Sequence, residues 1–170
     1  MNKQLLSGLS EVLNHSDSEN RIHDEQLNRL LIQQTGAWAV GIWKIEGENL
    51  QQVLCTFEEG FPEPVAKDFQ QQTVQVPLAH TQLGIVNAIV NNRPALALAA
   101  EQQGDLAKSA GWLNRFGARC SLSCPIVDSS GNSQAVIAVS WKQLYKQTDA
   151  VPQKLLSIAK QLGDDLFLSE

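Results

Sequence analysis

The spacing of apolar residues changes along the chain and divides it into helices and strands. Apolar side chains recur every three to four positions over 2–14 and again from Ile22 to Gly36, which predicts two helices. Beyond that glycine the period falls to two, which predicts strands over 37–45 and 50–57 with a turn between them. The chain therefore opens with helices and continues into a β-hairpin.

Proline and asparagine residues divide the middle of the chain into shorter elements. Pro64 suits the first turn of a short helix, and Thr81 suits the N-cap of a second helix that ends at an Asn-Asn pair. A brief strand ends at Pro77, and another begins at Pro94. In chain order the predicted elements are a helix over 64–72, a strand over 74–76, a helix over 81–91, a strand over 94–98 and a short helix within 106–113.

Two strong strands and an amphipathic helix form the last part of the chain. In the strand over 118–127, apolar residues alternate with Arg119, Ser121 and Ser123, so one row faces a core and the other faces polar surroundings. A turn leads into a returning strand over 133–141. This order of elements predicts an α+β fold with its helices gathered on one face of a sheet. We expect a single domain over 1–170, made of N-terminal helices over 1–35, a sheet core with inserted helices over 37–141 and a C-terminal helix over 152–168.

Composition and charge narrow the class of protein. The chain has 170 residues, and its 13 Lys and Arg against 18 Asp and Glu give a net charge of −5. This acidic balance argues against a nucleic-acid partner. No apolar run approaches the ~18 residues of a membrane span, and polar residues interrupt the N-terminal leucines where a signal peptide needs an apolar core. We therefore expect a cytoplasmic protein with no membrane span.

Cysteines and histidines give no sign of a metal or cofactor site. The 3 cysteines form no CxxC pair, which suits a reducing cytosol, and the 3 histidines are scattered. Cys120 and Cys124 are ~13 Å apart along one strand, beyond the ~7 Å limit of a disulfide. We expect both of them, and Cys55, to be small core residues, and we predict no cofactor.

Four segments, taken together in this order, resemble a GAF domain. They are the strand with Trp38-Ala39-Val40-Gly41-Ile42-Trp43, the segment Val76-Pro77-Leu78 before a helix with Gly84, the turn Asn91-Asn92-Arg93-Pro94, and the strand Gly117-Ala118-Arg119-Cys120-Ser121-Leu122-Ser123-Cys124-Pro125-Ile126. The resemblance implies a twisted antiparallel sheet of about six strands. It also implies that the N- and C-terminal helices pack on one face of the sheet and that a small-molecule pocket lies on the other. A PAS-like fold is the structural alternative.

The resemblance implies a sensory or regulatory domain that binds a small molecule, dimerises, or does both in signalling. We expect it to form the N-terminal part of a longer protein with a downstream effector domain. Two alternatives stay open: a GAF-type enzyme that reduces free methionine sulfoxide, and a structural dimerisation module whose pocket is filled by Trp43, Trp112 and Phe116. No cysteine lies between Phe57 and Arg119, where the enzymatic branch needs them, so we expect no enzyme activity. The signatures of cyclic-nucleotide and bilin binders are also missing.

Four polar residues are candidates for binding an anionic ligand. His80 and Thr81 precede a predicted helix, whose N-terminal N–H groups and dipole favour negative charge. The resemblance places that helix and the polar row of Arg119 and Ser121 beside the pocket, where these four residues are candidates to hold a carboxylate or a phosphate. The alternative is that they are ordinary surface residues.

Tryptophans are candidates for the apolar wall of the same pocket. Trp38 and Trp43 are separated by an odd number of positions, so strand alternation predicts that one lies under the helices and the other in the pocket. Trp112 belongs to the segment that would cover the pocket. Aromatic walls with a few polar groups are usual for small-ligand sites, and an ordinary aromatic core is the alternative.

The terminal helices carry leucine-rich stripes wide enough to pack on a sheet. The resemblance implies that such helices continue into a dimer bundle, so we expect a homodimer. The sequence leaves open whether the core of one chain uses these stripes completely. The stripe residues are Leu5, Leu9, Val12, Leu155, Ile158, Leu162 and Leu166.

Overall fold

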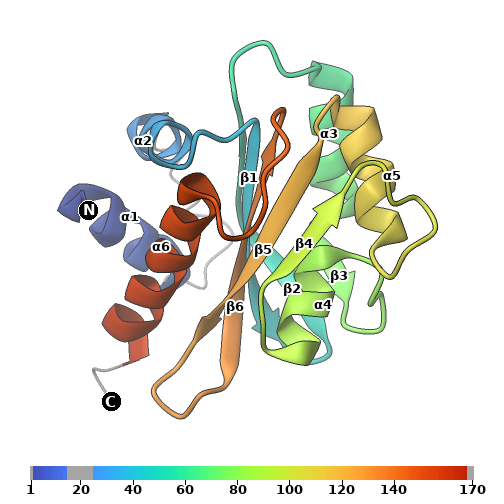
Figure 1. Cartoon of the computed structure of the whole chain (residues 1–170). Helices are drawn as coiled ribbons and strands as arrows, with labels where there is room; N and C mark the ends of the chain where they lie inside the picture. The colour runs from blue at the N-terminus through green and yellow to red at the C-terminus, as the bar shows by residue number, and fades with distance from the viewer. Residues whose placement is uncertain (1, 15–24, 168–170) are drawn as a thin grey trace.

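Six strands form one antiparallel sheet with helices on both faces (Figure 1), so the expectation from element order that the helices gather on one face is wrong. The computed structural model describes residues 2–14 and 25–167. The strands lie in the order β3-β2-β1-β6-β5-β4, and every neighbouring pair is antiparallel, which confirms the predicted α+β class. The strands are β1 (Ala39–Glu46), β2 (Asn49–Phe57), β3 (Gln75–Pro77), β4 (Ala95–Leu98), β5 (Cys120–Val127) and β6 (Ser133–Trp141). The helices are α1 (Lys3–Asn14), α2 (Glu25–Thr35), α3 (Glu63–Gln72), α4 (Gly84–Asn91), α5 (Ala107–Phe116) and α6 (Ala150–Phe167).

Large side chains cover the face of the sheet that packs against α1, α2 and α6, which lie together on one side in Figure 1. Trp141 belongs to this core, and its indole N–H donates a hydrogen bond of 2.9 Å to the Thr35 carbonyl of α2. The sheet and the three helices therefore share one hydrophobic core. One row across its strands contains Leu54, Ile42, Ile137 and Cys124.

The opposite face of the sheet, which we call the small-residue face, is built mainly from short side chains. Because short side chains leave space beneath α3, α4 and α5, larger groups from the surrounding elements are needed to fill it. One row across five strands contains Cys55, Gly41, Ala138, Ser123 and Ala95, and the next contains Phe57, Ala39, Ser140, Ser121 and Ala97.

The observed boundaries differ from the predicted ones at two helices. The α4 helix begins at Gly84 with Leu83 in the N-cap position and no side-chain cap, so the prediction that Thr81 caps it is wrong. A turn, closed by a hydrogen bond from the Leu83 N–H to the His80 carbonyl, delays the start of the helix. The α6 helix begins at Ala150, slightly before its predicted start. Two ends of predicted helices, Ile22 and Leu168, lie outside the described residues.

Residues 2–14 and 25–167 contain neither a candidate membrane span nor a candidate metal site. No helix there combines the length and the apolar character that a membrane-spanning segment requires. No group of three or more His, Cys, Asp and Glu side chains in the same residues is arranged to hold a metal ion.

Gly163 sets the distance between α6 and the sheet. A Cβ atom at this position would lie 2.3 Å from the Val127 carbonyl oxygen of β5. We expect Gly163→Ala to push α6 away from β5 and to lower the free energy of unfolding by ~1–3 kcal/mol, the usual cost of overpacking. Urea unfolding followed by circular dichroism measures this change.

The matched control is Gly111→Ala on the exposed side of α5, where an added Cβ has no atom within 4 Å. Alanine is the better helix former, so this variant is expected to keep or raise the stability. Equal losses in the two variants would contradict the assignment of close packing to Gly163.

Candidate functional site

Seven aromatic side chains fill the space over the small-residue face. They come from the start of β1, the end of β2, the segment before α3, and from α3 and α5, and their ring centroids lie 4.5 to 6.4 Å apart in contacting pairs. We call this group the aromatic cluster. Its members are Trp38, Trp43, Phe57, Phe61, Phe69, Trp112 and Phe116.

Phe69 of α3 lies at the centre of the aromatic cluster. Its ring centroid is 5.0 Å from Phe116, 5.1 Å from Trp112, 6.2 Å from Trp43 and 6.4 Å from Phe57. All four pairs are nearly perpendicular, with interplanar angles of 81° to 89°. Edge-to-face pairs of this kind stabilise a core beyond the area that they bury. The cluster is therefore a packed core with a defined geometry.

Trp43 is the member of the cluster that lies directly on the sheet. It is 1% exposed, and a Cβ atom on Gly41 would lie 2.2 Å from its Cη2 atom, so the indole ring occupies the place of a side chain at position 41. Its N–H donates a 2.7 Å hydrogen bond to the Thr73 carbonyl at the end of α3. Only glycine at position 41 permits this position of the ring.

Thr73 joins the end of α3 to the sheet through buried polar contacts. Its hydroxyl donates a 2.7 Å hydrogen bond to the Phe69 carbonyl and accepts one of 3.0 Å from the side-chain amide of Gln52. Because buried polar groups are costly when unpaired, this arrangement fixes α3, β2 and Trp43 relative to one another.

The prediction that Trp38 and Trp43 occupy opposite faces of the sheet is wrong. Trp38 precedes β1, where strand alternation does not apply, and its indole N–H donates a 2.8 Å hydrogen bond to the Phe116 carbonyl of α5. Both tryptophans thus belong to the aromatic cluster. The tryptophan that lies under the terminal helices is Trp141.

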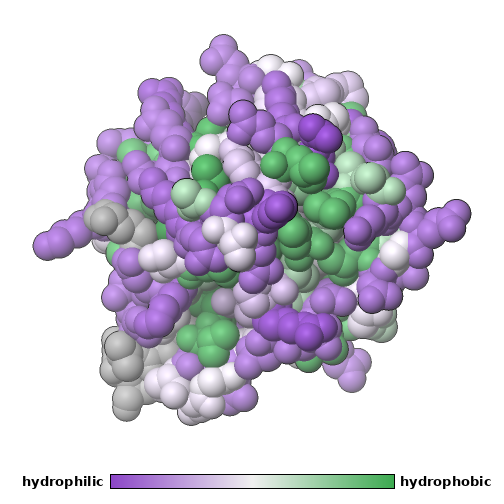
Figure 2. Space-filling view, in the orientation of Figure 1, coloured by the Kyte–Doolittle hydropathy of each residue, from purple (hydrophilic) through white to green (hydrophobic). Residues whose placement is uncertain are grey.

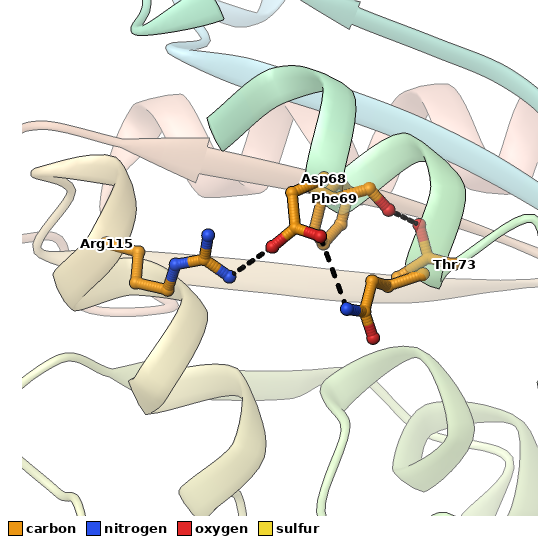
Figure 3. Close-up of polar contacts among 5 residues, drawn as sticks. Asp68, Phe69, Thr73 and Arg115 are labelled. Carbon is orange, nitrogen blue, oxygen red and sulfur yellow. Dashed lines mark hydrogen bonds and ion pairs between the residues drawn. The ribbon is translucent and has the colours of Figure 1, made fainter. Parts of the chain in front are cut away.

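An ion pair joins α3 to α5 over the aromatic cluster (Figure 3). The Arg115 guanidinium lies 2.7 Å from one carboxylate oxygen of Asp68, and the Gln72 amide donates a 3.2 Å hydrogen bond to the other. The hydrogen bond from Arg115, with a smaller contribution from Gln72, lowers the pKa of Asp68. Arg115 also lies over the ring of Trp112, 4.5 Å from its centroid. The pair therefore holds the two covering helices together.

The four polar candidates come from two segments, the turn before α4 and the start of β5. His80 and Thr81 are exposed in the turn before it, Arg119 is exposed, and Ser121 is half-buried. The first N–H of the helix, on Gly84, donates a 2.8 Å hydrogen bond to the Ser109 hydroxyl. An anion site formed by these four residues stays a prediction.

Two serines that the sequence did not indicate as site residues, Ser109 and Ser123, lie at the N-terminus of α4. The Ser123 hydroxyl is 2.9 Å from the point where a Cβ on Gly84 would lie, and Ser109 accepts the Gly84 N–H. Arg119 is four residues before Ser123, about 13 Å away along β5. The alternation of apolar and polar residues over 118–127 places Ser121 and Ser123 in the same polar row. Nothing in the local sequence shows which of the two serines faces α4.

The three cysteines have thiols of low reactivity. Burial raises the pKa of Cys55 and of Cys124 to about 12. Burial also raises the pKa of Cys120, whose thiol donates a hydrogen bond to the Gln143 carbonyl and accepts one from the Tyr145 N–H. None of the three is paired in a disulfide, and Cys120 and Cys124 are buried in the core as predicted, whereas Cys55 is only half-buried.

The candidate dimer stripes lie mostly inside the core of the chain itself. Five of the seven residues, Leu5, Leu9, Leu155, Ile158 and Leu162, are buried between the helices and the sheet. Val12 and Leu166 are half-buried against the same core. Most of each stripe is therefore used within one chain, and a homodimer through these helices stays a prediction.

Comparisons with known proteins identify the fold. No family model matches the chain, and no curated protein matches its sequence. The nlh2 GAF domain of A. aeolicus, in an inactive state, aligns over 98% of this chain and 96% of its own, with a TM-score of 0.63 and 14% identity. The phycocyanobilin-bound GAF domain of a cyanobacterial phytochrome aligns over 99% and 96%, with a TM-score of 0.64 and 11% identity.

A type II free methionine-R-sulfoxide reductase from Thermoplasma acidophilum is also similar, over 98% of this chain and 95% of its own, with a TM-score of 0.60 and 12% identity. At such identities the likeness concerns the fold. The chain has the fold of a GAF domain, as its sequence motifs predicted.

The contribution of Asp68 to stability is expected to depend on pH. Because Arg115 lowers the pKa of Asp68 in the folded chain, the ionised carboxylate stabilises the fold above the ordinary Asp pKa, and this stabilisation is lost as the pH falls through the lowered value. We expect Asp68→Asn to reduce the melting temperature slightly at pH 7 and to have no effect near pH 2. Thermal unfolding from pH 2 to pH 7 measures this difference.

The control is Asp164→Asn, which removes an ion pair with Lys160 within α6 alone. Because this ion pair lies within one helix, the variant is expected to change the melting temperature less than Asp68→Asn does at pH 7. A deficit of Asp68→Asn that is the same at all pH values would contradict the role of the ionised carboxylate.

Proposed function

We propose that this chain is a regulatory module of GAF type that acts through contacts with proteins and holds no small molecule on the small-residue face. The regulatory role is inferred from the fold. The aromatic cluster supports the proposal that this face holds no small molecule. Its side chains occupy the space between the sheet and the helices α3 and α5. A ligand there would have to displace Trp43 from Gly41 and break its hydrogen bond to Thr73.

A similar structure that binds a small molecule provides a contrast to the filled face of this chain. It is a GAF domain bound to phycocyanobilin. A site for a small organic molecule is usually a largely preformed cavity. In this chain, rings in contact at 4.5 to 6.4 Å and a ring seated on a glycine favour a closed core instead. A sensory domain that binds a small anionic molecule is the competing function, with His80, Thr81, Arg119 and Ser121 as its candidate residues.

A benzene-binding experiment tests whether the small-residue face is filled. Removing the buried ring of Phe116 by Phe116→Ala leaves an apolar cavity among Phe61, Phe69 and Trp112, and such cavities bind benzene. We expect saturating benzene to raise the melting temperature of Phe116→Ala and to leave that of the wild type unchanged. Loss of a buried Phe costs about 3–5 kcal/mol, so Phe116→Leu serves if the alanine variant does not fold.

Leu144→Ala, at a side chain that is 53% exposed, removes apolar atoms without making a cavity and is expected to show no benzene effect. Native mass spectrometry of the wild type, after incubation with an extract of its host, completes the test. A benzene response in the wild type, or a reproducible small-molecule adduct that Phe116→Ala abolishes, would overturn the proposal and favour the ligand-binding sensor.

A thiol-dependent enzyme is the second competing function, because one similar structure is a free methionine-R-sulfoxide reductase. Such an enzyme needs an ionised thiol as its nucleophile. With a pKa of about 12 for Cys55 and Cys124, roughly one thiol in ten thousand is ionised at pH 8. We therefore expect no turnover of free methionine sulfoxide with dithiothreitol at pH 8, and slow reaction of the native thiols with Ellman's reagent.

Unfolding in urea is the control for the thiol measurement, since it should release all three cysteines for rapid reaction. Turnover above the level of the variant in which all three cysteines are changed to serine would contradict the non-enzymatic assignment. A single Cys→Ser substitution that abolished such turnover would identify the nucleophile.

A further inference from the structure

The strand β4 forms an open edge of the sheet. It is the last strand in the order and pairs with β5 alone. In the described part of the chain, the backbone of β4 has one hydrogen bond outside that pairing, in which the Leu98 carbonyl accepts the Glu101 N–H. The other N–H and C=O groups that face away from β5 have no protein partner there. Such an edge is a template for another strand.

The two edges of the sheet differ in how they are protected. The opposite edge strand, β3, has three residues and ends in Pro77, both of which hinder pairing. The β4 edge is also short, with four residues, but it has no proline within the strand, and the run 94–100 contains no charged residue. Charged residues are the usual means by which soluble proteins block such edges. The β4 edge is therefore free to pair.

An open depression of about 440 Å³ lies beside β4. Its lining comes from α4, the turn before β4, the first residue of β4, the segment before α5 and the segment between β6 and α6: Asn87, Arg93, Pro94, Ala95, Asp105, Leu106 and Gln147. Figure 2 shows an apolar area where Figure 1 places β4. The depression therefore lies at the Ala95 end of β4, next to the exposed edge.

The charges at the two ends of β4 are opposite. Arg93 precedes the strand and Glu101 follows it; both are exposed, and neither forms an ion pair with another described residue. If two copies pair antiparallel, Arg93 of each lies toward Glu101 of the other. Parallel pairing would place like charges at the same end. The edge is thus complementary in charge to a second copy of itself in the antiparallel direction.

We propose that β4 of one chain pairs antiparallel with β4 of a second copy and joins the two sheets across a twofold axis. The inference goes beyond the proposed function, since it holds whether or not the small-residue face is filled. It gives the predicted homodimer a surface other than the helix stripes, which are buried. A four-residue strand pair is a small interface, so we expect a dimer with a dissociation constant on the order of micromolar.

Charge exchange across the interface tests this pairing by sedimentation velocity over about 1 to 200 µM, a range that brackets a micromolar dissociation constant. We expect Arg93→Glu alone, and Glu101→Arg alone, to weaken the dimer roughly tenfold, because each change acts twice across the twofold axis. The double variant Arg93→Glu with Glu101→Arg restores opposite charges and is expected to regain the dimer. Both positions are exposed, so the fold is expected to tolerate the changes.

Lys154→Glu on the exposed side of α6 makes the same change in net charge away from β4 and is expected to leave the dimer unchanged. Hydrogen exchange provides the second readout, with the amides of Leu96 and Leu98 expected to gain protection as the concentration rises. A monomer at every concentration, a dimer that ignores the charge exchange, or a dimer that only Lys154→Glu weakens would each overturn the proposal. The benzene experiment tests the small-residue face and the charge exchange tests the β4 edge, so one proposal can fail without the other.

Discussion

Contact between the Trp43 ring and the backbone of Gly41 is the constraint on which the filled face of the sheet depends. A side chain at position 41 would occupy the same space as the indole, and the Thr73 carbonyl fixes the indole N–H from the other side. The Thr73 hydroxyl also accepts a hydrogen bond from the Gln52 side-chain amide and donates one to the Phe69 carbonyl of α3. Gly41 therefore permits the position of the Trp43 ring, which in turn contacts Phe69 and bonds the residue at the end of α3.

The two faces of the sheet solve the packing problem in different ways. On one face, aliphatic residues of the strands interdigitate with stripes from α1 and α6, and the core is made by the elements in direct contact. On the other, short residues lie in two rows across five strands, and the volume above them is filled by rings from segments around the sheet. Close packing is reached on both faces, but on the second face it depends on aromatic rings from the segments around the sheet.

The surfaces that stay exposed after this packing are the ones available for binding other proteins. The leucine stripes of the terminal helices are used inside the chain, so they offer little apolar surface to a partner. The edge of β4 is different, since no element of the described chain covers it and no charge protects it. In a fold whose core is complete, the exposed backbone of an edge strand is the strongest remaining means of association.

The sequence by itself determined the order and type of the elements, because the change from a helical period to strand alternation is a local property of the chain. Alternation also identified the core row of β5, and the motif order identified the GAF fold. The tertiary structure alone decided that Trp38 turns toward Phe116 ahead of β1, that Leu83 rather than Thr81 precedes α4, and that Ser123 rather than Ser121 faces it. It also decided that Phe57, Phe61 and Phe69 complete one cluster with Trp112 and Phe116. These features depend on contacts between residues far apart in the chain, which no local pattern records.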